Sequence, residues 1–321
     1  HRRGPSDMKL FVLAALVGCA AALAVPNTLP KNFRSHRKAL MKVEHTKLPE
    51  GVETIPLFVN ADIPDSFDAR AAWPACPNIG YIRDQSDCGS CWAFAATEAL
   101  SDRICIASQG AKQPFLSADD LLSCCGLSCG FGCEGGYPIR AWNYFVKNGV
   151  CTGNGYYENE GCKPYPIEPC GTHTVDGETH YHNCTDIPDP ATPQCIKSCT
   201  NNAYTTPYDQ DKSFAKSAYA VPKNVNAIKT EIFNNGPVEA AFTVYEDFDA
   251  YTGGIYQHTW GQVLGGHAVK ILGWGSDAGT PYWLVANSWD YDWGEDGFFR
   301  IIQGTNECGI EEAIVAGLPK V

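Results

Sequence analysis

The sequence predicts an α+β protein built from two lobes. Helical periodicity runs from about Cys91 to Gly149, whereas the segment after Val238 contains short runs rich in β-branched and aromatic residues, as strands do. The chain has 321 residues, of which 44% are hydrophobic and 19% are charged. This composition is typical of a folded globular protein and excludes a disordered one.

The N-terminal residues are expected to precede the folded domain. From Met8, the stretch MKLFVLAALVGCAAALA has one lysine, an apolar run too short to span a membrane, and a small-residue cleavage pattern at Ala22-Leu23-Ala24. We interpret residues 8–24 as a secretory signal peptide and residues 1–7 as upstream sequence. No later segment contains about 18 consecutive apolar residues, so we expect a soluble mature protein without a membrane anchor.

Charge differs between this leader and the rest of the chain. Residues 1–62 hold nine Lys and Arg against five Asp and Glu, whereas residues 63–321 hold 15 against 31. A basic leader before an acidic body predicts a removable pro-segment, residues 25–62, that docks on the body, and it argues against nucleic-acid binding. The alternative is that the acidic surface only favours solubility.

The helical half contains three predicted helices. The first, CWAFAATEALSDRICIA, runs from Cys91 to about Ala107. In the second, LSADDLLSCC, Ser117 is the expected N-cap and Asp120 follows three residues later. The third, YPIRAWNYFVKNG, ends at Gly149.

The rest of the chain is predicted to be loops and then mostly strands. Residues 162–208 have little periodicity and contain five cysteines, so we expect long loops held by disulfides. One helix is expected near residues 225–234. The strand-like runs that follow are VEAAFTV, HAVKILGW, PYWLVANSW and GFFRII.

Sixteen cysteines in a chain with a secretory signal indicate disulfides rather than cytosolic thiols. Removal of Cys19 with the signal leaves fifteen, so at least one thiol is unpaired. Cys88 and Cys91 have the CxxC spacing that is also found in zinc sites and thioredoxin-type redox pairs. No second pair with zinc-ligand spacing follows and no βαβ pattern surrounds them, which disfavours both alternatives.

Cys91 is the candidate nucleophile. If Cys88 is bonded elsewhere, Cys91 is a free thiol at the start of a helix, where the helix dipole favours the thiolate. His267 heads one strand and Asn287 ends the next, so antiparallel pairing makes them neighbours, and Gln85 can donate to an oxyanion beside Cys91 N–H. Each of these residues also has a structural interpretation, but together they meet the requirements of acyl transfer by a thiol.

Several long motifs resemble the papain-type cysteine proteases: QSDCGSCWAF, GGHAV and NSWDYDWGEDGFFRI. Within that family the chain is similar to the cathepsin B branch, through SFDARAAWPAC, GGYPIRAWNYF, NGPVEAAFTVYEDF and CGIEEAIVAGLPK. The resemblance covers about residues 63–320. It implies a mature peptidase domain of residues 63–321, with a helical left lobe at about 75–214, a β-barrel right lobe at about 215–318 and an active-site cleft between them.

The resemblance also implies roles for individual residues. Cys91 is the nucleophile, His267 the base and acid, Asn287 the group that orients His267, and Gln85 the oxyanion donor. Trp289 would shield the bond between Asn287 and His267, and Gly135 and Gly136 would bind the substrate backbone as a short strand. No cofactor and no metal is implied.

The family's disulfide pattern uses twelve of the fifteen cysteines. The implied pairs are Cys76–Cys105, Cys88–Cys133, Cys124–Cys195, Cys125–Cys129, Cys162–Cys199 and Cys170–Cys184. Cys91, Cys151 and Cys308 remain, and Cys308 matches a position that is also unpaired in the family. Cys151 matches no family position, so we expect a buried, inert thiol there.

An occluding loop, which favours removal of C-terminal dipeptides, is expected at about residues 170–195. The family has two adjacent histidines where this chain has Thr172-His173, and Thr172 cannot pair with Asp84 as the first of them would. We therefore expect His173 to hold the substrate carboxylate, and a weaker clamp to allow more endopeptidase activity. In the alternative, His180 or His182 takes over the missing role.

Two further departures from the family concern specificity and the pro-segment. Ala313 stands where mammalian relatives have an acidic residue in the S2 pocket, so apolar P2 side chains should be preferred, and Glu312 should point away. The pro-segment is short and lacks the expected Trp-x-Ala-Gly stretch, although FRSHRKALMKVEH can form a basic helix on the acidic body. Asn183 begins a glycosylation sequon in the occluding loop.

The expected partners are peptide and protein substrates, the chain's own pro-segment and, by resemblance, cystatin-type inhibitors. We expect a monomer of the secretory pathway, in a lysosome, outside the cell or in a digestive lumen. Two alternatives stay open: a binding protein on the same fold, which should have lost Cys91 or His267, and a pure endopeptidase whose occluding loop never closes.

Overall fold

The computed structural model describes residues 39–60, 62–169, 171–175, 178–182 and 190–321. The expected signal peptide, the start of the pro-segment, the Cys170–Cys184 pair and Asn183 lie outside these residues. Within them, no helix has the length and apolar character that crossing a membrane requires.

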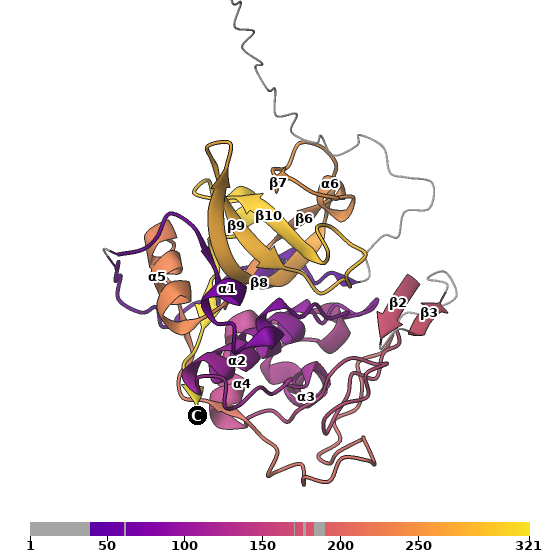
Figure 1. The fold of residues 1–321 in the computed structure, drawn as a ribbon. Coiled ribbons are helices and arrows are strands. Elements are labelled where there is room, and N and C mark those ends of the chain that lie inside the picture. The colour runs from indigo at the N-terminus through magenta and orange to yellow at the C-terminus, as the bar shows by residue number, and fades with distance from the viewer. Residues whose placement is uncertain (1–38, 61, 170, 176–177, 183–189) are drawn as a thin grey trace, which may run out of the picture.

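The helical lobe is built around one buried helix (Figure 1). This helix, α2 (Cys91–Ala107), is buried along residues 91–105, most of which are small or apolar, and its buried charged residues are paired. Helix α3 (Ala118–Cys124) begins where Ser117 Oγ accepts the Asp120 N–H at 3.0 Å, as predicted, and α4 (Pro138–Lys147) has proline in its first turn. The short elements of this lobe are α1 (Ala69–Ala72), η3 (Pro77–Gly80), η4 (Gly126–Ser128) and η5 (Gly132–Glu134).

The second lobe is an eight-stranded sheet, in the order β5-β11-β6-β8-β9-β10-β7, with β1 paired to β8. Its strands are β1 (Phe67–Asp68), β5 (Tyr219–Ala220), β6 (Val238–Tyr245), β7 (Ile255–Tyr256), β8 (Val263–Asp277), β9 (Thr280–Ala286), β10 (Phe298–Ile302) and β11 (Val315–Ala316). β6, β8, β9 and β10 are the predicted strands, and their pairing is antiparallel. The expected β-barrel is wrong: β5 and β7 end the order without pairing to each other, so this part of the chain forms an open sheet.

Smaller elements complete the described chain. Helix α5 (Val225–Asn235) matches the predicted helix, and Asn224 caps it by accepting the Ala227 N–H. The others are α6 (Glu246–Asp249), η2 (Val43–Thr46), η6 (Glu307–Gly309) and the pair β4 (Phe214–Ala215) and β12 (Pro319–Lys320). The segment expected to be only loops also contains an antiparallel hairpin, β2 (Gly171–Val175) and β3 (Glu178–His182), which stands apart from the main sheet (Figure 1).

Buried ion pairs join the two lobes across α2. Lys270 of β8 lies 2.9 Å from Asp102 of α2, and both side chains are buried. Arg103 of α2 pairs with Glu231 of α5 at 2.8 Å and donates to the Pro237 carbonyl at 2.7 Å. Because removal of one partner of a buried pair costs about 3–5 kcal/mol, these contacts hold the C-terminal half of α2 firmly against β8 and α5.

Five disulfides brace the helical lobe and its loops. They are Cys76–Cys105, Cys88–Cys133, Cys124–Cys195, Cys125–Cys129 and Cys162–Cys199. All five are pairs that the resemblance implies. Among the described residues, the free cysteines are Cys91, Cys151 and Cys308.

Candidate active site

The first residue of α2, Cys91, carries the candidate nucleophile. Its neighbour Cys88 is bonded to Cys133, so the Cys91 thiol is free. The backbone N–H groups of Cys91, Trp92 and Ala268 favour the thiolate, as expected at a helix N-terminus. Burial outweighs them and raises the pKa of Cys91 to about 12. The expected depressed pKa is therefore absent from the form of the protein in which the thiol is covered.

The candidate base sits on β8, next to Ala268. His267 Nε2 lies 2.7 Å from Asn287 Oδ1, and Asn287 directly follows β9, the strand paired with β8. An amide oxygen can only accept, so Nε2 carries the proton and Nδ1 is the nitrogen available for proton exchange. The Trp289 ring stacks on His267 with 4.6 Å between the ring centroids. The arrangement holds the imidazole in one tautomer and one orientation.

Gln85 is oriented from both ends of its side-chain amide. Gln85 Oε1 accepts the Ser288 hydroxyl at 2.7 Å, and the Gln85 backbone N–H donates to the Ser288 carbonyl. Its Nε2 donates to the carbonyl of Ala39 at 2.7 Å and to that of Cys88 at 2.8 Å. A carbonyl from the N-terminal segment thus occupies the donor that a substrate oxyanion would need.

Residues 39–46 lie between the two lobes, where a substrate backbone would lie. Met41 and Gly266 exchange both backbone hydrogen bonds, at 2.9 and 2.7 Å. Leu40 packs in the apolar cluster of the sheet lobe, whereas Met41 packs in that of the helical lobe. Of the basic helix expected over residues 33–45, the described part bears out only a short turn: Met41 pairs with Gly266 of β8, and the 3-10 helix η2 begins at Val43.

Two aromatic rings of the helical lobe receive the end of this segment. His45 is fully buried, with ring centroids 4.7 Å from Tyr137 and 5.9 Å from Phe131. Neither ring nitrogen of His45 has a hydrogen-bond partner among the described residues. Burial lowers the pKa of His45, and Lys42 and Arg140 lower it further against the opposite effect of Glu44. A role for His45 was not predicted from the sequence, although its position in the basic pro-segment indicated that it could contact the acidic body.

The two glycines expected to bind a substrate backbone have different surroundings. Gly135 has φ +109, and a Cβ there would lie 2.5 Å from Met41 and from His45, so it faces the inserted segment. A Cβ on Gly136 would instead lie 2.7 Å from the Trp92 ring. The absence of a side chain at Gly135 therefore leaves room for the inserted segment, and at Gly136 it allows Trp92 to pack beneath.

In the β2–β3 hairpin, His173 pairs with His180 and Thr172 with Tyr181. The ring of His180 stacks on Tyr157, with 4.1 Å between centroids and 12° between planes. Tyr157 OH in turn donates to Glu168 at 2.8 Å. Among the histidines proposed to replace the missing clamp, His180 thus has a defined contact to the body of the protein.

The residues expected to set specificity lie after η6. Ala313 is buried, with 3% of its surface exposed. Its neighbour Glu312 is exposed and lies 3.9 Å from Lys223, which agrees with a side chain directed away from Ala313. Asp84, beside Gln85, accepts the Ser86 N–H at 2.6 Å.

Comparisons with known proteins agree with this arrangement. Residues 63–318 match the family described as papain family cysteine protease. The chain is 54% identical to cathepsin B-like cysteine proteinase 4 of Caenorhabditis elegans, covering 98% of this chain and 100% of that protein. It is 48% identical to the gut-specific cysteine proteinase of the same organism, again covering 98% and 100%.

A solved structure extends the match to the precursor form. The fold is similar to that of procathepsin B S9 from Trypanosoma congolense, with a TM-score of 0.74, 37% identity, and coverage of 89% of this chain and 88% of that one. The match to a precursor supports the chain's own pro-segment as a partner of its peptidase domain, alongside protein substrates. The chain belongs to the papain family of cysteine proteases and, within it, to the cathepsin B-like cysteine proteinases.

Proposed function

We propose that this cathepsin B-like proteinase hydrolyses peptide bonds through Cys91, His267, Asn287 and Gln85, and that residues 39–46 inhibit it before processing. The observation that carries the proposal is the 2.7 Å bond from His267 to Asn287 beneath Trp289, next to the free thiol at the start of α2. Both reactive groups are present, which disfavours a binding protein on the same fold.

The mechanism follows from the roles of these groups. The Cys91 thiolate attacks the scissile carbonyl carbon, and Gln85 Nε2 and the Cys91 N–H stabilise the oxyanion. His267, which has taken the thiol proton, gives it to the leaving amine, and a thioester forms. Water then attacks the thioester with His267 as general base, which releases the acid product and restores the thiol. Asn287 keeps the imidazole in the productive tautomer throughout.

Inhibition would result from occupation of the same groups by the chain itself. Ala39 takes the Gln85 donor, and the Met41–Gly266 backbone pair uses the edge of β8 that a substrate strand would need. The exposed, apolar Leu57, Phe58 and Val59 lie between the docked segment and the peptidase domain. Removal of residues up to about 62 would free the site.

We also propose dipeptidyl carboxypeptidase and endopeptidase activity with a preference for apolar P2 side chains. Backbone pairing places β2 and β3 as a hairpin at the expected occluding loop, and the stack of His180 on Tyr157 can hold it near the body. His173 would then bind the substrate carboxylate. The buried Ala313 offers no charge to an Arg side chain at P2, so a guanidinium there would be unpaired.

One peptide series tests these activities. A ten-residue peptide with Phe at P2 is offered as free acid and as C-terminal amide, next to the same pair with Arg at P2, with Cys91→Ala as control. Stepwise loss of dipeptides from the Phe-containing acid alone is expected, and equal internal cuts in acid and amide would mean that the hairpin does not close. Faster cleavage with Arg at P2 would contradict the specificity, and no Cys91-dependent cleavage would contradict the proposed mechanism.

The location and the remaining partners follow from the leader sequence and from the relatives. A relative named for the gut is consistent with secretion into a digestive lumen, and the predicted signal peptide is consistent with this or with a lysosome. We propose a monomer that cystatin-type inhibitors bind at the site now covered by residues 39–46. Gel filtration of the processed protein, alone and with a cystatin, tests both statements.

A further inference from the structure

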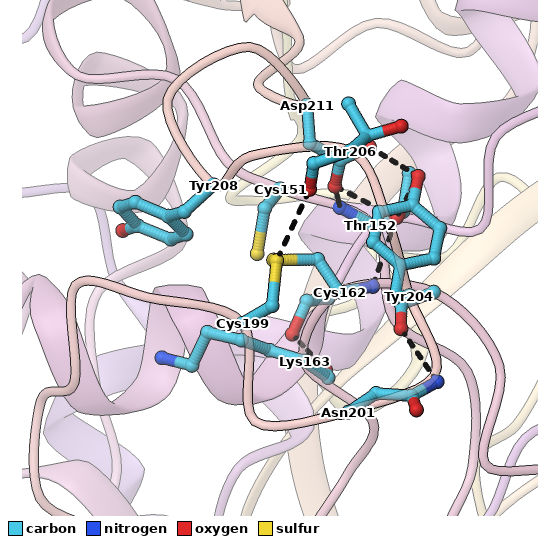
Figure 2. The surroundings of a disulfide bond; sticks show 12 residues. Cys151, Thr152, Cys162, Lys163, Cys199, Asn201, Tyr204, Thr206, Tyr208 and Asp211 are labelled. Carbon is cyan, nitrogen blue, oxygen red and sulfur yellow. Dashed lines mark hydrogen bonds between the residues drawn. A yellow bond between two sulfur atoms is a disulfide. The ribbon is translucent and has the colours of Figure 1, made fainter.

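Cys151, a free cysteine that the proposed mechanism does not use, lies in the loops of the helical lobe. Cys151 is fully buried and adjoins the Cys162–Cys199 disulfide, as Figure 2 shows. Cys151 Sγ, Cys162 Sγ and a carboxylate oxygen of Asp211 all lie within 4.8 Å of one another. The spacing would suit a metal ion, but the sulfur of Cys162 is already bonded, and a disulfide sulfur is not a thiolate ligand.

Backbone hydrogen bonds hold Cys151 and the neighbouring disulfide in place. Cys151 lies between two backbone bridges, Val150 with Ser213 and Leu116 with Thr152. Thr152, the next residue, connects Cys151 to the two loops that carry Asp211 and Cys162. Its N–H donates to Asp211 at 2.6 Å, and its hydroxyl accepts the Cys162 N–H at 3.2 Å. A thiol and a disulfide are therefore fixed side by side, within one small apolar cluster that also contains Tyr208.

We propose that Cys151, Cys162 and Cys199 form a thiol–disulfide exchange site, in which Cys151 replaces Cys199 as the partner of Cys162. The Cys151 proton passes to Asp120, which releases it to solvent, and Cys151 Sγ bonds to Cys162 Sγ. The Cys162–Cys199 bond breaks, its electron pair goes to Cys199 Sγ, and that sulfur takes a proton from solvent. One disulfide and one thiol exist before and after, so the step needs no external oxidant or reductant.

The surroundings suit the product of this exchange. Cys199 is half-buried at the surface, and its sulfur lies 3.4 Å from the Thr206 carbonyl, which can accept a bond from the released thiol. The main chain nearby stays anchored, because the N–H groups of Thr200 and Asn201 both donate to the Cys162 carbonyl. The exchange would thus move the free thiol from the interior to the surface without unfolding the loop.

The electrostatics keep the exchange slow while the structure is closed. Burial and the negative charge of Asp120 raise the pKa of the Cys151 thiol, with a smaller effect of Asp211 in the same direction and the opposite effect of Lys163. Tyr144 and Tyr208 also face this group. The thiolate is the attacking species, so the rate should rise about tenfold for each pH unit below the thiol pKa.

In the unfolded chain, the length of the loop that each disulfide closes favours Cys151 over Cys199 as the partner of Cys162. Cys162 and Cys199 are separated by 37 residues, whereas positions 151 and 162 differ by 11. Closure of the shorter loop is favoured about sixfold in a flexible chain. The folded structure must reverse this preference, so a denatured chain in a glutathione buffer should form Cys151–Cys162 more often than Cys162–Cys199.

The exchange is tested by disulfide mapping in the full chain with Cys91→Ala, which removes both proteolysis and the catalytic thiol. The folded protein is kept in a glutathione buffer at about pH 8.5, then quenched in acid, alkylated, digested and analysed by mass spectrometry. We expect a Cys151–Cys162 peptide to appear together with an equal amount of alkylated Cys199. Alkylation of Cys199 without that peptide, or no change at all, would overturn the proposal.

A variant tests the same pairing without competition. With Cys199→Ala added, Cys151 and Cys162 should be found joined, whereas with Cys151→Ala and Cys199→Ala together, Cys162 should be alkylated. Recovery of both Cys151 and Cys162 as free thiols in the folded Cys199→Ala protein would contradict the proposal. If that variant does not fold, the mapping of the chain with all three cysteines still decides the question.

Discussion

Two buried thiols in one lobe, Cys91 and Cys151, differ mainly in what surrounds them. Around Cys91, backbone N–H groups of Cys91, Trp92 and Ala268 favour the thiolate, and His267 stands on the adjoining strand. Around Cys151, the carboxylates of Asp120 and Asp211 oppose it. Burial raises the pKa of both, so burial alone does not distinguish a nucleophile from an inert thiol.

The difference teaches that reactivity is set by which group covers the thiol. Residues 39–46 cover Cys91, and they belong to the segment that the sequence predicts to be removable. Cys151 is covered by the lobe itself, through α3 and the loops that carry Cys162 and Tyr208. Loss of the pro-segment should therefore activate the first thiol and leave the second unchanged.

The largest expected effect separates the two thiols by activity. Cys91→Ala should reduce kcat/KM of the processed enzyme by about 10⁴-fold or more, because the attacking atom is lost. Cys151→Ala should leave kcat/KM within about twofold, because Cys151 contacts no group of the proposed mechanism. Steady-state kinetics with one fluorogenic peptide measure both variants. A large loss of kcat/KM in Cys151→Ala would contradict the distinction between a catalytic and a non-catalytic thiol.

The next effect concerns the accessibility and charge of Cys91. If processing returns its pKa from about 12 to an ordinary value near 8.5, the thiolate fraction at neutral pH rises about 10³-fold. Alkylation of Cys91 by iodoacetamide should accelerate by at least that factor when residues up to about 62 are removed. Cys151 in the same digest is the internal control, and equal acceleration at both sites would indicate general loosening of the lobe.

Gln85 is a proposed oxyanion donor beside Cys91, and it has no counterpart in the proposed site at Cys151. Gln85→Ala should lower kcat by about 10²-fold with little change in KM, because an oxyanion donor acts mainly in the transition state. Ser288→Ala is the matched control: it removes only the 2.7 Å bond that orients the Gln85 amide, so its effect on kcat should be smaller. A greater loss in the control would mean that Ser288, rather than Gln85, contacts the substrate.

Much of this comparison could be predicted from the sequence, for identifiable reasons. The helix at Cys91 and the strands bearing His267 and Asn287 have strong periodicity, and antiparallel pairing brings the last two together. The conformation of residues 39–46 could not be predicted, because Met41 takes an extended conformation from its pairing with Gly266 and only the short turn η2 is local. The neighbours of Cys151 depend equally on the packing of loops that have no periodicity.

The open sheet shows a further limit of the sequence. Each long strand was recognisable, but whether β5 and β7 close a barrel depends on tilt and twist accumulated over the whole sheet. The β2–β3 hairpin was missed because its strands are short and polar, and it packs outside the main sheet.

The smallest expected effect concerns His45, which links the cover of Cys91 to pH. Its pKa is lowered in the docked state from an ordinary value near 6.5, so docking is unaffected above that pH and weakens as pH falls toward the lowered pKa. Below that second pKa no further weakening is expected. His45→Phe keeps an aromatic ring between Phe131 and Tyr137 but cannot be protonated.

The pH at which the precursor becomes active should therefore fall in His45→Phe, since between 6.5 and the lowered pKa each pH unit costs the docked segment of the natural protein up to about tenfold in its equilibrium. Activity of the precursor after incubation across an acidic pH series measures this shift. Glu44→Gln is the matched control, because Glu44 is exposed and acts on His45 only through its charge, so it should change the midpoint less. Identical pH profiles for His45→Phe and the natural sequence would show that a group other than His45 controls the pH dependence of activation.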